Sequence, residues 1–187
     1  MAISLTGEPT LYEHLSELIQ VFHRKGFTTF LVSNGTLPQT LAGLDEEPTQ
    51  LYISVCAPDE QTFKHVCHPQ ISKGWERLKE TLALLPSFKC PTVMRITSAR
   101  GLNMRNTEGY AGLIEKAEPT YIEVKAYMHV GFSRRRLGYE STPSHDGIFE
   151  FGKQLADKTG YNLIAESIES RVALLSKRER SIRFGDG

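Results

Sequence analysis

Runs of β-forming residues alternate with helical stretches along most of this 187-residue chain. The first run, 3–5, meets the turn Gly7-Glu8-Pro9, and apolar residues at helical spacing follow as far as Phe22. A second run, 28–32, ends in the polar turn 33–36. Strand, helix and strand in this order are typical of a parallel unit, because parallel neighbours need a crossover connection.

The same alternation continues down the chain. It predicts strands at 50–55, 92–97 and 121–125 and helices at 60–66, 72–85 and 107–117. Thr10 and Glu13 have the spacing of a capping box, so the first helix is predicted to begin at Thr10. Each of the five strands ends in a polar turn. The chain is therefore predicted to be an α/β protein whose site lies at the carboxyl ends of its strands.

The pattern changes after Pro143. A helix at 144–158 is followed by two strand-like runs, 161–164 and 171–175, with few residues between them. This short separation favours antiparallel pairing, which predicts a small α+β cap at the end of the sheet.

Composition restricts the functional class only weakly. Lys and Arg together number 22, as do Asp and Glu, so the net charge indicates no class of partner. No apolar run approaches the ~20 residues that span a membrane. The three cysteines, Cys56, Cys67 and Cys90, are odd in number and widely spaced. They argue against a disulfide framework and predict a reducing compartment, the cytoplasm.

Five ordered motifs lie at the ends of successive predicted strands. They are Ser4–Tyr12, Phe30–Thr36, Gln50–Ser54, Arg95–Thr97 with Gly101–Met104, and Ile122–Lys125 with Tyr127–Gly131. In these motifs the chain resembles the archaeal radical-SAM tRNA 4-demethylwyosine synthases. The resemblance runs from Ile3 to about Ser176, and five collinear motifs are more specific than one.

The resemblance implies a reaction, its cofactors and its partners. That family joins N1-methylguanosine-37 of a tRNA to a two-carbon piece of pyruvate, as a radical-SAM carbon–carbon lyase, and the product is 4-demethylwyosine. The cofactors are S-adenosylmethionine and a [4Fe–4S] cluster held by a C-x3-C-x2-C loop. No such loop is present, because Cys56, Cys67 and Cys90 are too far apart in sequence.

The resemblance also implies the fold. Residues 1–142 are expected to form a partial parallel (β/α) barrel of the radical-SAM type with its first strand missing. Residues 143–187 are expected to form the C-terminal α+β cap and basic tail of the same domain. We therefore expect a late start, a split gene or a shortened chain that is inactive alone. A separate N-terminal segment would carry the cluster cysteines, and no metal ligands are predicted in this chain.

The resemblance assigns Gly7, Glu8 and Pro9 to the amino group of S-adenosylmethionine. Asn34 and Arg95, expected at the ends of neighbouring strands, are assigned to the same cofactor, as partners of a ribose or a carboxylate. Three alternatives stay open: Glu8 stabilises the following helix, Asn34 is a turn residue, and Arg95 forms a salt bridge.

Lys125 is the candidate nucleophile. An amine on an otherwise apolar strand is poorly hydrated, which favours the neutral form that makes a Schiff base with pyruvate. His129 is a candidate acid or base in the loop that follows. The alternatives are an ion pair of Lys125 with Glu123, which shares its face, an outward-facing amine, and a hydrogen-bonding role for His129.

Arg134, Arg135 and Arg136 are the candidate phosphate contacts to tRNA, with Tyr127 or Phe132 available to stack a base. The alternative is a solvated loop. Two further functions are open: a cluster-free tRNA- or nucleotide-binding relative, and a ketoacid lyase that uses the lysine without iron.

Overall fold

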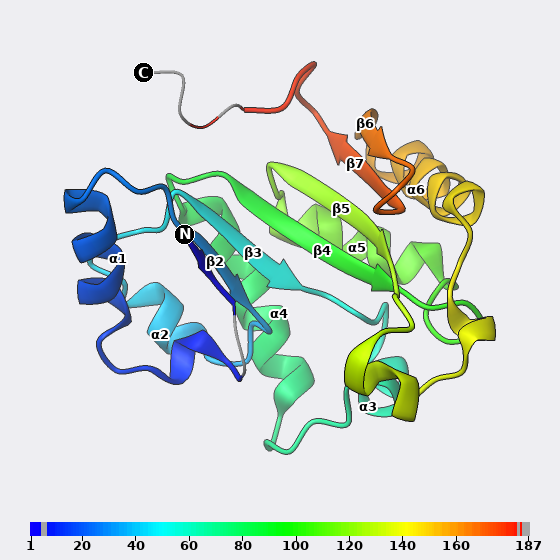
Figure 1. Cartoon of the computed structure of the whole chain (residues 1–187), viewed down its shortest axis with the longest axis horizontal. Coiled ribbons are helices and arrows are strands. Elements are labelled where there is room, and N and C mark those ends of the chain that lie inside the picture. Colours follow the sequence, from blue (N-terminus) through cyan, green and yellow to red (C-terminus); the bar gives the residue numbers. More distant parts are fainter. Residues whose placement is uncertain (5–6, 183, 185–187) are drawn as a thin grey trace.

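The computed structural model describes residues 1–4, 7–182 and 184. Its strands are β1 (Ala2–Ile3), β2 (Phe30–Ser33), β3 (Gln50–Ser54), β4 (Thr92–Ser98), β5 (Tyr121–Ala126), β6 (Asn162–Ser167) and β7 (Val172–Ser176). They form one sheet in the order β1-β2-β3-β4-β5-β7-β6 (Figure 1). Strands β1 to β5 pair in parallel, and β7 is antiparallel to both β5 and β6. The predicted run of parallel strands with an antiparallel end is therefore confirmed.

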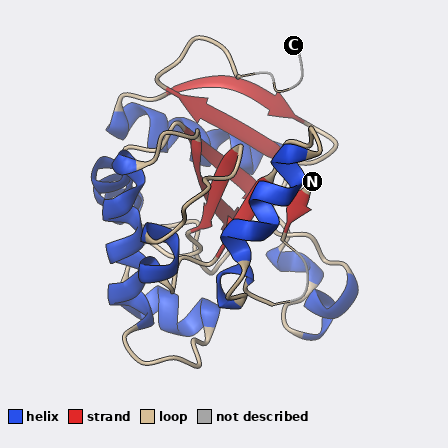
Figure 2. Cartoon of the chain, turned by 90° about the vertical axis from the view of Figure 1, so that its left-hand side faces the viewer, coloured by secondary structure: helices blue, strands red, loops and turns tan. Residues whose placement is uncertain are grey.

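Helices line the sheet in chain order. They are α1 (Leu15–Arg24), α2 (Pro38–Ala42), α3 (Glu60–Cys67), α4 (Gly74–Leu84), α5 (Thr107–Ala117) and α6 (His145–Thr159), with the short 3-10 turns η1 (Pro9–Leu11), η2 (Leu85–Ser87), η3 (Gly131–Arg135) and η4 (Tyr139–Ser141). Helices α2, α4, α5 and α6 contact one another in that order and form a layer against the sheet (Figures 1 and 2).

Alternate residues of each strand face this helical layer. Leu31, Ile53, Ile96 and Val124 have no exposed surface, and they join helix side chains in one hydrophobic cluster. The residues between them point to the opposite face, called the open face below, which is only partly buried. It carries Val32, Tyr52, Ser54, Arg95, Thr97, Glu123 and Lys125. The polar side chains of the strands are thus concentrated on the open face.

The C-terminal part extends the same sheet, since β7 lies directly beside β5. The division at residue 142 between barrel and cap stays a prediction. Among the helices of the described residues, none combines the length and the apolar character that crossing a membrane requires.

The start of the first helix was predicted wrongly. Thr10 lies in η1, and α1 begins at Leu15. The Thr10 amide and hydroxyl both donate to the Glu8 carboxylate, so Thr10 does not cap a helix with Glu13. Helix α2 was not predicted, because its five residues are too short to show a hydrophobic period.

Candidate active site

The carboxyl ends of β1 to β5 lie along one edge of the sheet, called the mouth below. Glu8 connects the turns that follow β1 and β2. Glu8 Oε1 accepts hydrogen bonds from Thr10 N at 3.1 Å, Thr10 Oγ1 at 2.7 Å and Ser33 Oγ at 2.8 Å. Its Oε2 accepts from the Asn34 amide at 2.8 Å, the one hydrogen bond that this oxygen receives among the described residues. Glu8 is also the N-cap of η1, and Pro9 opens that turn. The helix-stabilising alternative for Glu8 therefore holds for the short η1, and its cofactor role stays a prediction.

Asn34 closes its own turn. Its Oδ1 accepts from Thr36 N at 2.9 Å and from Thr36 Oγ1 at 2.6 Å. The next residue, Gly35, has φ +71°, and a Cβ there would lie 2.8 Å from Leu78 Cδ1. The turn therefore requires glycine, and the turn-residue interpretation of Asn34 describes its contacts.

Arg95 is held on the open face by two neighbours. Its Nε and Nη2 donate to Glu123 Oε1 and Oε2 at 2.7 and 3.3 Å, and its guanidinium carbon lies 4.4 Å from the centre of the Tyr52 ring. Burial, followed by the charge of Glu123, raises the pKa of Tyr52. The salt-bridge alternative is thus realised. Arg95 and Asn34 do not end neighbouring strands as expected, because β3 lies between β2 and β4.

Lys125 is half-buried near the carboxyl end of β5. It lies between Thr97 of β4 and Val172 of β7 in the sheet register. The alternative of an ion pair with Glu123 is not realised, because that carboxylate is engaged by Arg95. Within the part of the chain that the structure describes, the Lys125 amine has neither a hydrogen bond nor an ion pair. Lys125 therefore presents at the mouth a primary amine that no described residue binds by a hydrogen bond or an ion pair.

The loop after β5 is anchored by Tyr127. The Tyr127 hydroxyl lies 3.0 Å from Ser133 O and 3.3 Å from Leu137 O, and the residue is largely buried, so its stacking role stays a prediction. Phe132 is the more accessible of the two rings, because it is 80% exposed and has the Arg135 guanidinium 5.3 Å from its ring centre. The exposed aromatic and the arginine are a combination that binds unpaired bases.

The other candidate residues of this loop face different partners. His129 Nδ1 lies 3.5 Å from the Tyr127 hydroxyl, which fits its hydrogen-bonding alternative. Arg134 Nε donates to the His129 carbonyl at 3.2 Å. Arg136 lines a pocket instead. The three consecutive arginines therefore do not form a single patch.

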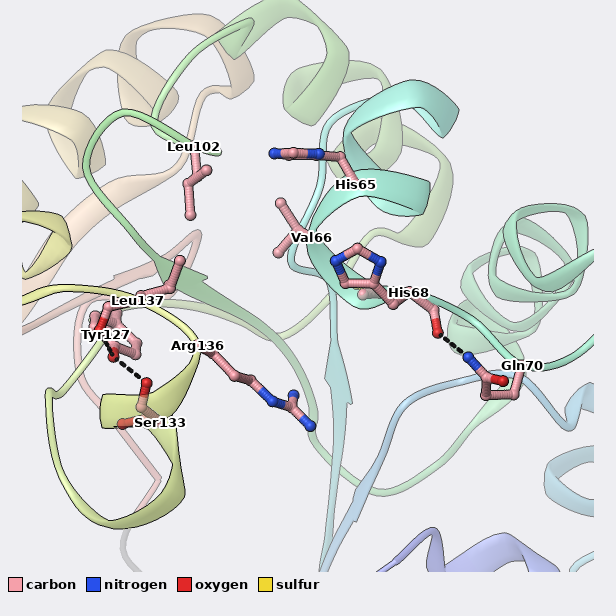
Figure 3. Close-up of a pocket in the computed structure, with 10 residues that line it drawn as sticks. His65, Val66, His68, Gln70, Leu102, Tyr127, Ser133, Arg136 and Leu137 are labelled. Atoms are coloured by element: carbon pink, nitrogen blue, oxygen red, sulfur yellow. Dashed lines mark hydrogen bonds between the residues drawn. The ribbon is translucent and has the colours of Figure 1, made fainter.

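That pocket, of about 920 Å³, separates the loop from α3. Figure 3 shows the Arg136 side chain extending away from the loop into the space below α3. The walls are formed by apolar and polar side chains of the segments that follow β3, β4 and β5, including Val66, Leu102, Leu137, His65 and His68. A cavity of this size, with apolar side chains beside His65, His68 and Arg136, suits a small organic ligand or a nucleotide.

The cysteines do not form a cluster site. Cys56 follows β3 at the mouth and Cys67 ends α3, whereas Cys90 precedes β4 at the opposite edge. Burial and the charge of Glu47 raise the pKa of Cys90 to about 12. Among the described residues, no three His, Cys, Asp or Glu side chains are placed to hold a metal ion. The residues present therefore do not fit a [4Fe–4S] cluster, which needs cysteine thiolates around one centre.

Comparison with known proteins relates the chain to one class of enzyme. The family model for wyosine base formation matches residues 116–177, which include Lys125. The S-adenosyl-L-methionine-dependent tRNA 4-demethylwyosine synthase of Pyrococcus horikoshii is 46% identical over 180 residues, covering 94% of this chain and 53% of the relative. That of Methanocaldococcus jannaschii is 44% identical over 182 residues, covering 97% and 57%. The chain thus spans about half the length of these relatives.

Solved structures agree with this relationship. TYW1 with a lysine–pyruvate adduct bound superposes with a TM-score of 0.87 at 44% identity, covering 97% of this chain and 57% of that one. Archaeal TYW1 gives a TM-score of 0.79 at 40% identity over the same shares. The Escherichia coli coproporphyrinogen III oxidase HemN, a radical-SAM enzyme, gives 0.58 at 15% identity and covers 91% of this chain and 41% of its own, which shows a common fold alone. The predicted resemblance and the radical-SAM type of fold are confirmed.

Proposed function

We propose that this chain, which is homologous to the tRNA 4-demethylwyosine synthases, is the part of such an enzyme that binds pyruvate, S-adenosylmethionine and tRNA. In the cytoplasm, the whole enzyme condenses N1-methylguanosine-37 of tRNA with pyruvate to 4-demethylwyosine. The observation that carries the proposal is the Lys125 amine at the mouth, which has no hydrogen-bond or ion-pair partner among residues 1–4, 7–182 and 184 and lies within the segment that matches wyosine base formation. The related TYW1 structure with a lysine–pyruvate adduct supports it.

Lys125 acts as the nucleophile that fixes pyruvate. The neutral amine attacks the ketone carbon, and loss of water gives an imine that holds the substrate on the open face. Arg95 lies on the same face one strand away, with two of its nitrogens engaged by Glu123. Its remaining N–H groups can bind a carboxylate, and the carboxylate assigned to them is that of the cofactor.

Borohydride trapping tests this step without iron or RNA. Reduction in the presence of labelled pyruvate should attach label to a single tryptic peptide that contains Lys125. Lys125→Arg should lose the label, whereas Lys116→Arg, at an exposed position on α5, should keep it. Label retained by Lys125→Arg, or absent from the parent chain, would falsify the assignment.

S-adenosylmethionine fits the β1–β2 side of the mouth by donor chemistry. Glu8 Oε2 accepts one hydrogen bond and has capacity for the cofactor's ammonium group. The exposed Gly7, with Pro9 and Asn34 beside it, borders the same turn, and Arg95 is the candidate partner of the cofactor carboxylate. When bound, S-adenosylmethionine supplies the radical precursor of the reaction. Equilibrium dialysis with labelled cofactor, comparing Glu8→Gln with the exposed Glu13→Gln, tests this position; equal binding by the two variants would count against it.

We propose that the [4Fe–4S] cluster is held by cysteines other than Cys56, Cys67 and Cys90. In the described sheet β1 is an outer strand, beside an apolar groove of about 410 Å³ lined partly by Ile3, Tyr12, Leu18 and Phe22. We propose that a separate segment bearing the cluster cysteines pairs with β1 and covers this groove. Anaerobic reconstitution of the chain alone should leave iron and sulfide far below one cluster per molecule, and a stoichiometric cluster would disprove the need for that segment.

A cluster-free RNA-binding relative is the second candidate, favoured by the exposed Phe132 and its arginine neighbours. One experiment distinguishes the two candidate functions. A chain that binds an anticodon stem-loop but takes up no pyruvate label under borohydride supports the second candidate, and label on Lys125 supports the first.

A further inference from the structure

The open face of the sheet carries a carboxylate within reach of the Lys125 amine. Glu123 and Lys125 lie on the same face of β5, two residues apart, and such neighbours on a strand are separated by roughly 6.6 Å. A lysine side chain can span that distance. The amine nevertheless forms no hydrogen bond or ion pair with residues 1–4, 7–182 and 184. The spacing therefore allows a pairing that the structure does not make.

Arg95 engages both oxygens of that carboxylate. In the sheet register Arg95 of β4 lies opposite Glu123, and the uncharged Thr97 lies opposite Lys125. The guanidinium donates from Nε to Oε1 at 2.7 Å and from Nη2 to Oε2 at 3.3 Å, and the Glu123 side chain is only 14% exposed. A contact at two points fixes the direction of a carboxylate as well as its position. Glu123 is thus directed toward β4 and not along its own strand toward Lys125.

The guanidinium is itself held from β3. The Tyr52 ring centre lies 4.4 Å from the Arg95 guanidinium carbon, and the Tyr52 hydroxyl donates to Gln50 Oε1 at 3.0 Å. A planar guanidinium stacks well on an aromatic ring while its edge binds a carboxylate. Tyr52 and Glu123 therefore hold Arg95 from the strands on either side.

Glu123 is the only carboxylate that the described strands around Lys125 place on the open face. The titratable and charged side chains of β3, β4 and β5 on that face are Tyr52, Arg95, Tyr121 and Glu123, and β7 contributes the apolar Val172 and Leu174. Helix α6 also packs against β5, but from the helical layer on the opposite face. Beyond the strands, Arg171 donates to the Pro143 carbonyl, and the His129 ring lies beside the Tyr127 hydroxyl.

We propose that Arg95 is a positioning residue for Lys125, because it keeps Glu123 from pairing with the amine. The inference rests on the proposed function for the step that it serves, the attack on pyruvate. An ammonium paired with a carboxylate holds its proton more firmly, and a protonated amine is not a nucleophile. Arg95 thereby preserves the neutral form of Lys125. The cofactor carboxylate would use the N–H groups of Arg95 that Glu123 leaves free.

Competitive acetylation with acetic anhydride tests this role without pyruvate, cofactor or RNA. Only the neutral amine reacts, so the pH dependence of acetylation at Lys125, mapped on peptides beside the exposed Lys116, reports its protonation. Arg95→Met frees Glu123. Acetylation of Lys125 at neutral pH should then fall about tenfold, and its half-maximal pH should rise by about one unit. Acetylation of Lys116 should be unchanged.

A second substitution separates the freed carboxylate from a general effect on the fold. Combining Arg95→Met with Glu123→Gln should return Lys125 acetylation to within about twofold of the parent, because no carboxylate is left to pair with the amine. If Arg95→Met does not fold, Arg95→Gln retains N–H donors without the charge and should shift the profile in the same direction by less. An unchanged profile in the folded single variant, or a double variant as slow as Arg95→Met, would overturn the proposal.

Borohydride trapping distinguishes failure of this inference from failure of the proposed function. If both hold, Arg95→Met should take up less pyruvate label on Lys125 than the parent chain does. A parent chain without label, whose Lys125 acetylation still responds to the variants as expected, would contradict the proposed function and retain the role of Arg95. Label on the parent chain with an unchanged acetylation profile in Arg95→Met would do the reverse.

Discussion

The two sides of the mouth differ in what their polar side chains are bonded to. On the β1–β2 side, Glu8 accepts hydrogen bonds from its own turn and from the turn after β2, and Asn34 accepts from its own turn. On the β4–β5 side, Arg95 is paired with Glu123, and this pairing leaves Lys125 without a partner among the described residues. Both sides carry polar residues at strand ends, so position alone does not show which of them the fold already uses. The hydrogen bonds and ion pairs among the described residues do show this difference.

This difference has a thermodynamic consequence. Where the chain itself satisfies a polar group, removing that group costs folding free energy. Where the group is left unpaired, its removal should cost function and little stability. The variants below test that separation, beginning with the largest expected effect on free energy.

Gly35→Ala should give the largest loss of stability, about 3 kcal/mol, because the new Cβ would combine positive φ with a contact inside normal packing distance. Urea denaturation measures it. Gly112→Ala is the matched control, since its Cβ meets nothing within 4 Å on the exposed side of α5, and it should be neutral or stabilising by up to about 1 kcal/mol. Equal effects of the two variants would show that the β2 turn is not under this constraint.

Glu8→Gln should destabilise the fold by about 2 kcal/mol, because an amide cannot accept all four hydrogen bonds that the carboxylate accepts. Lys125→Met should change the free energy of unfolding by no more than about 0.5 kcal/mol. The exposed Glu13→Gln is the control for loss of charge. A Lys125→Met variant as unstable as Glu8→Gln would remove the distinction between the two sides.

Replacing Arg134, Arg135 and Arg136 together by alanine should weaken binding of an anticodon stem-loop about tenfold, equal to about 1.4 kcal/mol, and flatten its dependence on salt. Because the three side chains face different partners, single replacements should differ, with Arg136 affecting pocket ligands most. Fluorescence anisotropy at several salt concentrations measures both quantities. An unchanged affinity and salt dependence would show that the three arginines belong to a solvated loop and do not contact RNA.

Asp59→Ala should cost about 1 kcal/mol, because the variant loses the N-cap of α3. The hydrogen bond from the Thr62 amide is the main reason that the pKa of Asp59 is lowered. Its contribution is therefore present at neutral pH and is lost as the pH falls below about 4, through the lowered pKa. Asp59→Asn keeps a capping oxygen but does not titrate, so its stability relative to the parent should rise over that acid range. Parallel pH profiles of the two proteins would contradict this account.

Sequence reasoning located most elements because each shows a local pattern. The helix expected at 107–117 has those bounds, and the five parallel strands lie where β-rich runs end in polar turns. The prediction failed in two places. Thr10 does not cap the first helix, because it hydrogen-bonds Glu8, and α2 is too short to show a hydrophobic period.

The site was predicted less completely than the fold. Strand alternation placed Lys125 and Glu123 on one face, but it gave no sign that Glu123 pairs with Arg95 rather than with the lysine. Such pairings are set by tertiary geometry, which no local spacing encodes.

The strand order also bears on how the chain assembles during synthesis. Each strand from β2 to β5 pairs with the one made just before it, so every unit finds its partner already present when it leaves the ribosome. The last two strands break this rule, because β7 lies between β5 and β6. Because β6 pairs with β7 in the described sheet, it can join the sheet only after β7 has been synthesised. The edge of β5 that carries Lys125 is therefore paired last.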